Sequence, residues 1–175
     1  DAGCSEIIQL IGYQPLMATV VIEAEEACAG GEGIFDVLRG AKVGYLPPFL
    51  RTDAMETFRA NTQALFSPGI NRLYRTLPER AATRLMGRWI TNAFSGRRAD
   101  SVGVIYAHER KPAGFVSIRY EAGRPATIDL LAVDPDCRGE GRGRQLAAWA
   151  RENYAGARVR TEADNASALK MYHAE

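Results

Sequence analysis

The hydrophobic pattern along the chain predicts a series of short strands. Apolar runs over 102–107 and 115–120 are separated by a turn that contains a Lys-Pro pair, which predicts a β-hairpin. The run over 128–133 is more uniformly apolar, as is typical of a buried strand, and we expect the hairpin to pair with it. Shorter runs of the same kind predict two further strands, at 17–22 and 158–162.

Apolar residues at helical spacing predict two helices between the first strand and the hairpin. The first helix spans 53–66, with Asp53 and Glu56 as a capping box. The second helix starts at another capping box, formed by Thr76 and Glu79, and a proline in its first turn supports this start. The apolar face of the second helix, with a tryptophan as its anchor in the core, consists of Ala82, Leu85, Met86, Trp89, Ile90 and Ala93.

The order of these elements predicts an α/β (α+β) fold, with a mixed, mostly antiparallel central sheet flanked by helices. A length of 175 residues is within the size of one domain. We expect this domain to span 53–175, and we expect residues 1–52 to form an N-terminal segment that adds a partial sheet or a substrate-side lobe.

A basic, glycine-rich turn joins the run at 128–133 to a further helix-like stretch. Asp134 and Pro135 end the strand. Glycine allows positive φ, so successive N–H groups in such a turn can point at one anion, and the helix N-terminus adds partial positive charge. The alternative is a basic surface turn. The predicted anion-binding residues are Arg138, Gly139, Glu140, Gly141, Arg142, Gly143 and Arg144.

This turn differs from the two best-known phosphate-binding motifs. No Gly-Lys-Ser/Thr sequence follows it, which excludes a Walker A motif. Arg144 stands where the dinucleotide-binding fingerprint would need a glycine. The turn therefore matches neither of these two motifs.

The stretch from Val133 and Pro135 into the Arg-x-x-Gly-x-Gly sequence that starts at Arg138 resembles motif A of the GNAT N-acetyltransferases. In that family the loop amides hold the pyrophosphate of acetyl-CoA, so the resemblance implies acetyl-CoA as co-substrate. It also implies a splayed strand pair that forms the acetyl-CoA cleft. Cofactor-binding positions are then expected at Leu131, Ala132 and Val133, and the backbone groups of Leu131 and Val133 would face the pantetheine arm.

A second motif follows the predicted strand at 158–162. The sequence Asn165-x-x-Ala-Leu-x-x-Tyr172 resembles motif B of the same family, in which the Asn touches CoA and the Tyr lies near the thioester sulfur. The resemblance implies that Asn165 binds the cofactor and that Tyr172 is the catalytic acid for the leaving thiolate. The alternatives are a helix cap for Asn165 and a core aromatic residue for Tyr172.

The general base stays open at this stage. Asp129 and Glu162 lie on the two strands that would flank the cleft, yet each could equally be the structural partner of an arginine. Bulk water is the third alternative, because a sugar amine beside electron-withdrawing groups can be largely neutral near pH 8.

Two stretches, 73–93 and 168–172, look most like the bacterial TDP-fucosamine acetyltransferases. Those enzymes acetylate the 4-amino group of a TDP-linked 4-amino-4,6-dideoxy sugar, which implies a small-molecule nucleotide amino sugar as acceptor. The alternatives are a protein or antibiotic amine as acceptor, or a non-enzymatic acyl-CoA-binding module. Candidate residues for the acceptor side are Tyr45, Phe49, Arg72, Tyr74 and Arg75.

Composition limits the partners and the compartment. A net charge of +1 gives no strong field toward nucleic acid or membranes, and we expect neither as a partner. Three widely spaced cysteines favour free thiols in a reducing cytoplasm and argue against a metal site. The oligomeric state, including a homodimer, is left open. The family normally continues into a further strand, so we expect a C-terminal strand beyond Glu175 to be missing.

Overall fold

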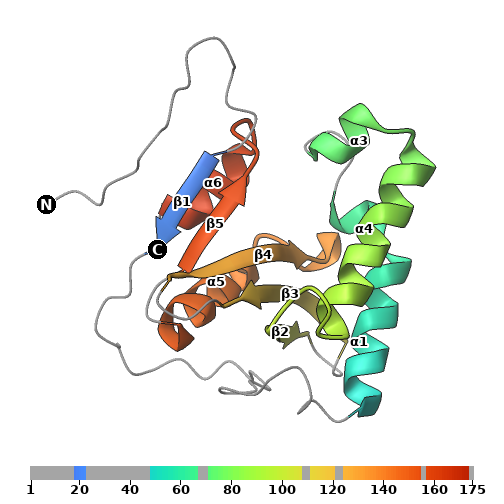
Figure 1. The fold of residues 1–175 in the computed structure, drawn as a ribbon, viewed down its shortest axis with the longest axis horizontal. Helices are drawn as coiled ribbons and strands as arrows, with labels where there is room; N and C mark the ends of the chain where they lie inside the picture. The colour runs from blue at the N-terminus through green and yellow to red at the C-terminus, as the bar shows by residue number, and fades with distance from the viewer. Residues whose placement is uncertain are drawn as a thin grey trace, which may run out of the picture.

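A single five-stranded sheet forms the centre of the computed structural model (Figure 1), with the strand order β1-β5-β4-β3-β2. All neighbouring strands are antiparallel except β4 and β5, which are parallel. The strands are β1 (Ala18–Ile22), β2 (Ser101–Tyr106), β3 (Pro112–Arg119), β4 (Ala126–Val133) and β5 (Ala157–Thr161). The structure describes residues 18–22, 48–66, 71–107, 111–120, 124–154 and 157–173.

Helices cover both faces of the sheet. The helices α1 and α4 lie side by side on one face, and α5 covers the other (Figure 1). Apart from a short 3-10 helix, η2 (Pro135–Cys137), the helices are α1 (Pro48–Ala60), α2 (Thr62–Leu65), α3 (Arg72–Thr76), α4 (Glu79–Phe94), α5 (Arg142–Asn153) and α6 (Ala166–His173). This arrangement confirms the predicted mixed, mostly antiparallel sheet flanked by helices.

Three phenylalanines join α1, α4 and the sheet. The rings of Phe58 and Phe115 have centroids 4.9 Å apart, and those of Phe94 and Phe115 are 5.5 Å apart. None of the three side chains is more than 1% exposed. Each such ring contributes on the order of 1.5–3 kcal/mol by leaving water, so this cluster fixes the two helices on their face of the sheet.

The predicted start of the first helix is wrong. The helix α1 begins at Pro48 rather than Asp53, so Asp53 lies exposed inside the helix and does not cap it. Proline has its φ fixed near the helical value and lacks an N–H that would need a partner, which suits the first helical position. The helix also runs across the predicted boundary between 52 and 53, and the division into two segments stays a prediction.

The second predicted capping box is also wrong, because its two side chains have other positions and partners. Thr76 is the last residue of α3, and its hydroxyl donates to the carbonyl of Leu73 at 3.5 Å. The Glu79 carboxylate accepts a hydrogen bond from Gln63 at 2.6 Å instead of capping α4. Within α4, Trp89 is half-buried and packs against the core cluster, as the predicted anchor would, although it is not fully buried.

The strand predictions hold to within one or two residues, except that β3 begins three residues and β4 two residues before the predicted starts. The hairpin of β2 and β3 pairs with β4 as expected. The predicted strand at 17–22 is β1, which pairs with β5 and so extends the central sheet.

Candidate active site

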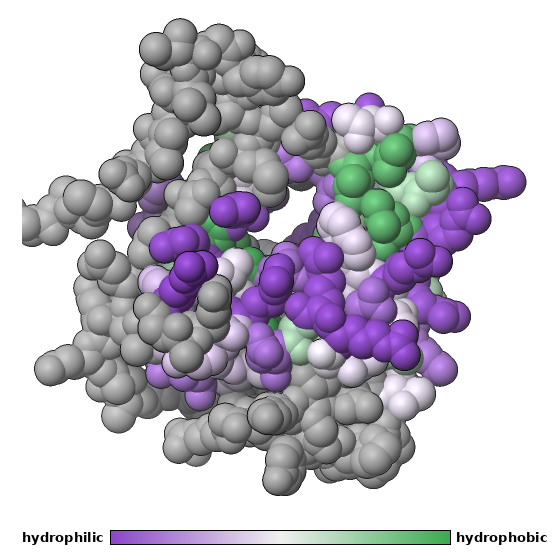
Figure 2. All heavy atoms as spheres, in the orientation of Figure 1, coloured by the Kyte–Doolittle hydropathy of each residue, from purple (hydrophilic) through white to green (hydrophobic). Residues whose placement is uncertain are grey.

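The parallel strands β4 and β5 pair only over their first residues. Ala126, Thr127 and Ile128 of β4 each have a partner in β5, and the pairing ends at Ile128. The remaining five residues of β4 run on to Val133, and all of them except Asp129 are paired with β3 alone. Figure 2 shows the surface hollowed between the part of the molecule that carries β5 and the part that carries α3 and α4. The two strands therefore separate as the splayed pair that the sequence predicted.

A β-bulge in β4 lies where this separation begins. The register with β3 pairs Ser117 with Leu130 and Ile118 with Ile128, which leaves Asp129 as an extra residue. The amide of Leu130 donates to the Ser117 hydroxyl at 3.1 Å. A bulge bends its strand and increases the local twist, which is a physical reason for β4 to turn away from β5 here.

The backbone direction beyond the bulge decides which amides face the hollow. The amide of Asp134 donates to the carbonyl of Ala113 in β3 at 2.8 Å. Since successive residues of a strand direct their N–H and C=O groups to opposite edges, the amide of Ala132 also faces β3. Those of Leu131 and Val133 face the open edge. Two of the three predicted positions on β4 thus direct backbone groups into the cleft, and Ala132 does not.

The glycine turn leaves open space at the start of α5. Gly139 and Gly141 have φ values of 81° and 77°, the left-handed region that favours glycine. A Cβ atom built on either residue would meet nothing within 4 Å. Gly141 is the N-cap of α5 and has no side chain to bind the amides of the first helical turn. These amides and the positive end of the helix dipole can therefore serve an anion.

Arg138 is bound to the protein backbone. Its Nε donates to the carbonyl of Val133 at 3.0 Å, and its Nη2 donates to the carbonyls of Ala64 and Leu65 at 3.2 and 2.9 Å. The guanidinium thereby ties the end of α2 to the end of β4. Its expected role as a direct phosphate ligand stays a prediction, whereas this structural contact is observed.

Arg142 balances the one acidic residue of the turn. Its guanidinium pairs with the Glu140 carboxylate at 2.5 Å, and its Nη1 donates to the carbonyl of Tyr106 at 3.3 Å. This pair neutralises a negative charge that would repel a bound anion. Arg144, two residues on, is exposed on the first turn of α5.

Gly143 has a packing role. A Cβ atom on this residue would lie 2.8 Å from Sδ of Met171 in α6, closer than atoms can approach without a shift. The glycine therefore lets α6 pack against the first turn of α5. The neighbouring residue along α6, Tyr172, is buried with 6% exposure, and burial raises the pKa of its phenol. The core contacts of Tyr172 match the alternative given above, and its catalytic role stays a prediction.

Asn165 caps α6. Its Oδ1 accepts hydrogen bonds from the amide of Ala168 and the hydroxyl of Ser167, both at 3.2 Å. Its Nδ2 donates to Oγ1 of Thr161 at 3.4 Å. The alternative interpretation as a cap is therefore observed, and contact with CoA stays a prediction.

Several of the residues predicted as general base or as acceptor contacts form structural contacts with other residues, and some others lie outside the described part of the chain. Asp129 is ion-paired with Arg98, a residue that the sequence pattern did not single out. Tyr74 shares a hydrogen bond with the Thr83 hydroxyl at 3.1 Å. Arg75 pairs with Asp164 at 2.5 Å, which joins α3 to the turn before α6. Residue Tyr45 and the side chains of Phe49 and Arg72 lie outside the described part of the chain.

The splayed strand pair, the glycine turn and the N-terminus of α5 lie next to one another along the chain, and sequence comparison identifies the family. The model of the acetyltransferase (GNAT) family matches residues 68–174, more than half of the chain. The chain belongs to the GNAT acetyltransferase family, which confirms the predicted family.

The first of three similar solved structures supports the fold. PH1933 from Pyrococcus horikoshii is 18% identical, with 77% of this chain and 84% of that chain covered and a TM-score of 0.53. An acetyltransferase from the GNAT family of Colwellia psychrerythraea is 17% identical, with 87% and 49% covered and a TM-score of 0.49. A candidate streptothricin acetyltransferase from Bacillus anthracis, in complex with acetyl coenzyme A, is 28% identical, with 42% and 44% covered and a TM-score of 0.37.

This chain thus spans less than half the length of the last two proteins. No curated protein sequence is significantly similar. Among the described residues, no three His, Cys, Asp or Glu side chains are grouped to hold a metal ion. None of the described helices has the length and apolar character needed to cross a membrane.

Proposed function

We propose that this protein transfers the acetyl group of acetyl-CoA directly to a primary amine. The observation that carries the proposal is the combination of two features at one edge of β4. The amides of Leu131 and Val133 face the splayed side of the strand, and the open glycine turn follows directly at the start of α5. The first feature suits the pantetheine arm of a thioester donor, and the second suits its diphosphate.

The donor would lie along β4 with its diphosphate at the turn. Gly139 and Gly141 leave room for phosphate oxygens close to the backbone, and Arg142 offsets the charge of Glu140. The carbonyl of Val133 is already bound by Arg138, so its amide is the group of that residue left for the donor. An amide at this edge can stabilise the oxyanion that develops when the amine attacks the thioester carbonyl.

Tyr172 would act on the leaving thiolate as a hydrogen-bond donor. Burial raises the pKa of its phenol, whereas a thiol has an ordinary pKa of about 8.5. Complete transfer of the tyrosine proton to the thiolate is therefore unfavourable. A shared hydrogen bond lowers the energy of the departing thiolate without that transfer, and the proton released by the attacking amine can neutralise the thiolate later.

For the acceptor we propose the 4-amino group of a TDP-linked 4-amino-4,6-dideoxy sugar. The proposal rests on the resemblance of 73–93 and 168–172 to the TDP-fucosamine acetyltransferases. These stretches form most of α3, nearly all of α4 and much of α6. Arg75 is a cation of α3, and its guanidinium pairs with Asp164. The proposal includes a cytoplasmic location, which the free, buried thiol of Cys137 suits.

An acceptor panel tests this function. Calorimetry first measures the affinity for acetyl-CoA, and release of CoA is then followed with the TDP amino sugar, lysine peptides and aminoglycosides. Turnover with the sugar at the highest kcat/KM supports the full proposal. Turnover with only a peptide or an antibiotic keeps the chemistry and refutes the sugar. Binding of acetyl-CoA without turnover of any amine would support a non-enzymatic module.

A further inference from the structure

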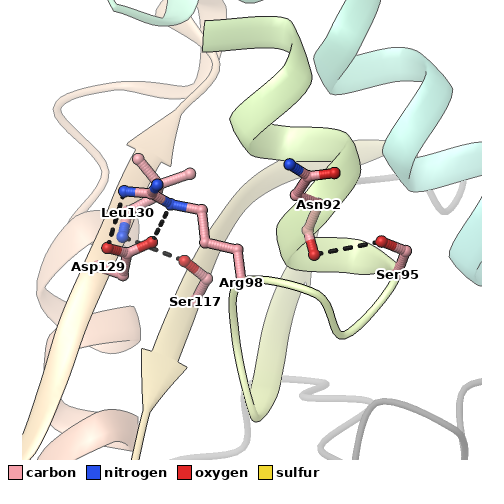
Figure 3. A network of polar contacts seen from close by, with 6 residues as sticks. All are labelled: Asn92, Ser95, Arg98, Ser117, Asp129 and Leu130. Carbon is pink, nitrogen blue, oxygen red and sulfur yellow. Dashed lines mark hydrogen bonds and ion pairs between the residues drawn. The ribbon is translucent and has the colours of Figure 1, made fainter. Parts of the chain in front are cut away.

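A network of polar contacts joins the loop after α4 to the bulge of β4 (Figure 3). The Nε of Arg98 donates to Oδ2 of Asp129 at 2.5 Å, and Nη2 of Arg98 donates to Oδ1 at 3.0 Å. The same guanidinium lies 4.3 Å from the ring centroid of Trp89 on α4. The Asp129 side chain is only 11% exposed and that of Arg98 29%. Two hydrogen bonds and one ring contact therefore fix the orientation of this ion pair.

The ion pair acts on Asp129, which interrupts the ladder between β4 and β3. Asp129 is the extra residue of the bulge, and the amide of the next residue, Leu130, is bound by the Ser117 hydroxyl. The bulge is thus fixed twice, by the side chain of Asp129 and by the backbone of Leu130. Both contacts lie next to Ile128, where the pairing of β4 with β5 ends.

We propose that Arg98 and Asp129 are positioning residues for acetyl transfer. By holding the bulge of β4, they determine that the amides of Leu131 and Val133 face the cleft. This inference rests on the proposed function, because the ion pair is said to orient the amides that would contact the pantetheine arm of the thioester donor. It also gives Asp129 a role other than general base.

The reason is the period of a strand. If the bulge were lost while Ile128 stayed paired with Ile118, each later residue of β4 would slip by one position along β3, and the edge to which its backbone groups point would be reversed. The amides of Leu131 and Val133 would then face β3, and that of Ala132 would face the cleft. Arginine suits the role because its planar fork binds both carboxylate oxygens at once and stacks on an aromatic ring. Lysine keeps the charge but offers neither the fork nor the stacking surface.

The test compares Arg98→Lys and Asp129→Asn with the control Arg97→Lys, an exposed neighbour in the same loop. Each variant is titrated with CoA and with 3′-phospho-ADP, the part of CoA that lacks the pantetheine arm. We expect both Arg98→Lys and Asp129→Asn to lose CoA affinity by about tenfold and kcat by roughly a hundredfold, the scale of a misplaced reacting group. Affinity for 3′-phospho-ADP should stay within about twofold, because the turn at α5 is unchanged.

Two results would overturn the inference. Equal losses for CoA and for 3′-phospho-ADP would indicate general damage to the fold. A loss of kcat confined to Asp129→Asn, with Arg98→Lys like the control, would indicate that Asp129 is the base.

Amide hydrogen exchange of the protein without ligand gives a readout independent of function. We expect faster exchange over 128–133 in both test variants and unchanged exchange in α4. If wild type binds neither CoA nor 3′-phospho-ADP, the proposed function fails, while faster exchange would still support the positioning of the bulge. Unchanged exchange over 128–133 would contradict that positioning directly.

Discussion

Tyr172 illustrates how burial sets the properties of a single side chain. Desolvation disfavours the phenolate and raises the pKa of Tyr172 above its ordinary value of 10.0. The folded state therefore keeps this proton at a pH at which the unfolded chain has lost it. The resulting contribution to stability is complete below pH 10 and is lost as the pH rises from there through the folded pKa.

We predict that Tyr172→Phe removes this part of the pH dependence and impairs acetyl transfer. Urea unfolding of wild type and Tyr172→Phe between pH 8 and 11 should show a stability difference that changes in favour of the variant as the pH rises. At saturating substrates kcat should fall by roughly tenfold to a hundredfold, with acetyl-CoA affinity nearly unchanged. A kcat close to wild type would exclude Tyr172 as the donor to the thiolate.

Gly143 is constrained by a neighbour from another helix. A methyl group at this position would lie 2.8 Å from Sδ of Met171, so the methionine or α6 would have to move. We predict that Gly143→Ala destabilises the protein by about 1 kcal/mol, the low end for overpacking because methionine is adaptable. The matched test is the same change in a Met171→Ala background, measured by urea unfolding. There the cost should disappear, and an unchanged cost would show that this contact is not its cause.

At the scale of elements, Arg138 joins two segments that are far apart in the sequence. Its guanidinium donates to carbonyls at the end of α2 and at the end of β4. We predict that Arg138→Ala lowers the free energy of unfolding by about 1 kcal/mol, since each hydrogen bond is partly exposed and of modest net value. The control is Arg80→Ala on the exposed face of α4, which should change stability by less than ~0.5 kcal/mol.

A second measurement separates the two roles discussed for Arg138. If the guanidinium only ties α2 to β4, Arg138→Ala should weaken 3′-phospho-ADP by no more than about threefold. A loss of roughly tenfold or more, together with a smaller dependence of binding on salt, would show direct contact with phosphate.

Helix starts were the least accurate sequence predictions at this scale. The capping boxes at Asp53/Glu56 and Thr76/Glu79 are absent. Instead, α1 begins at Pro48, and Pro78 directly precedes the first residue of α4. A capping box depends on two side chains reaching two amides, and these side chains have other positions or partners. A fixed proline φ is a property of the residue itself and is therefore a more dependable signal.

At the scale of the whole molecule, the phenylalanine cluster connects the helical layer to the sheet. Phe115 of β3 is fully buried between Phe58 of α1 and Phe94 of α4. We predict that Phe115→Ala lowers the free energy of unfolding by about 3–5 kcal/mol, because it removes a ring and leaves a cavity. Chemical denaturation followed by circular dichroism measures this. A loss below ~1 kcal/mol would show that the helical layer is held by other contacts, and Tyr120→Ala at an exposed site is the control.

Much of the fold and part of the site follow from local sequence. The apolar runs identified the five strands, and the glycine turn with its arginines identified the start of α5. Both depend on residues close in the chain, whose periodicity and φ preferences are intrinsic. The same holds for the family, because motif A and the region of Asn165 and Tyr172 are continuous segments.

Tertiary structure alone decided which groups face the cleft. The sequence gives no sign that Asp129 is the extra residue of a bulge, since a bulge is defined by the register with β3. Nor does it distinguish Arg98 from the adjacent Arg97, although only Arg98 pairs with Asp129 and stacks on Trp89. Local sequence determined the strands and the turn because their causes are local. The direction in which the amides of β4 point could be learned only from the folded chain, because it depends on contacts between residues about thirty positions apart.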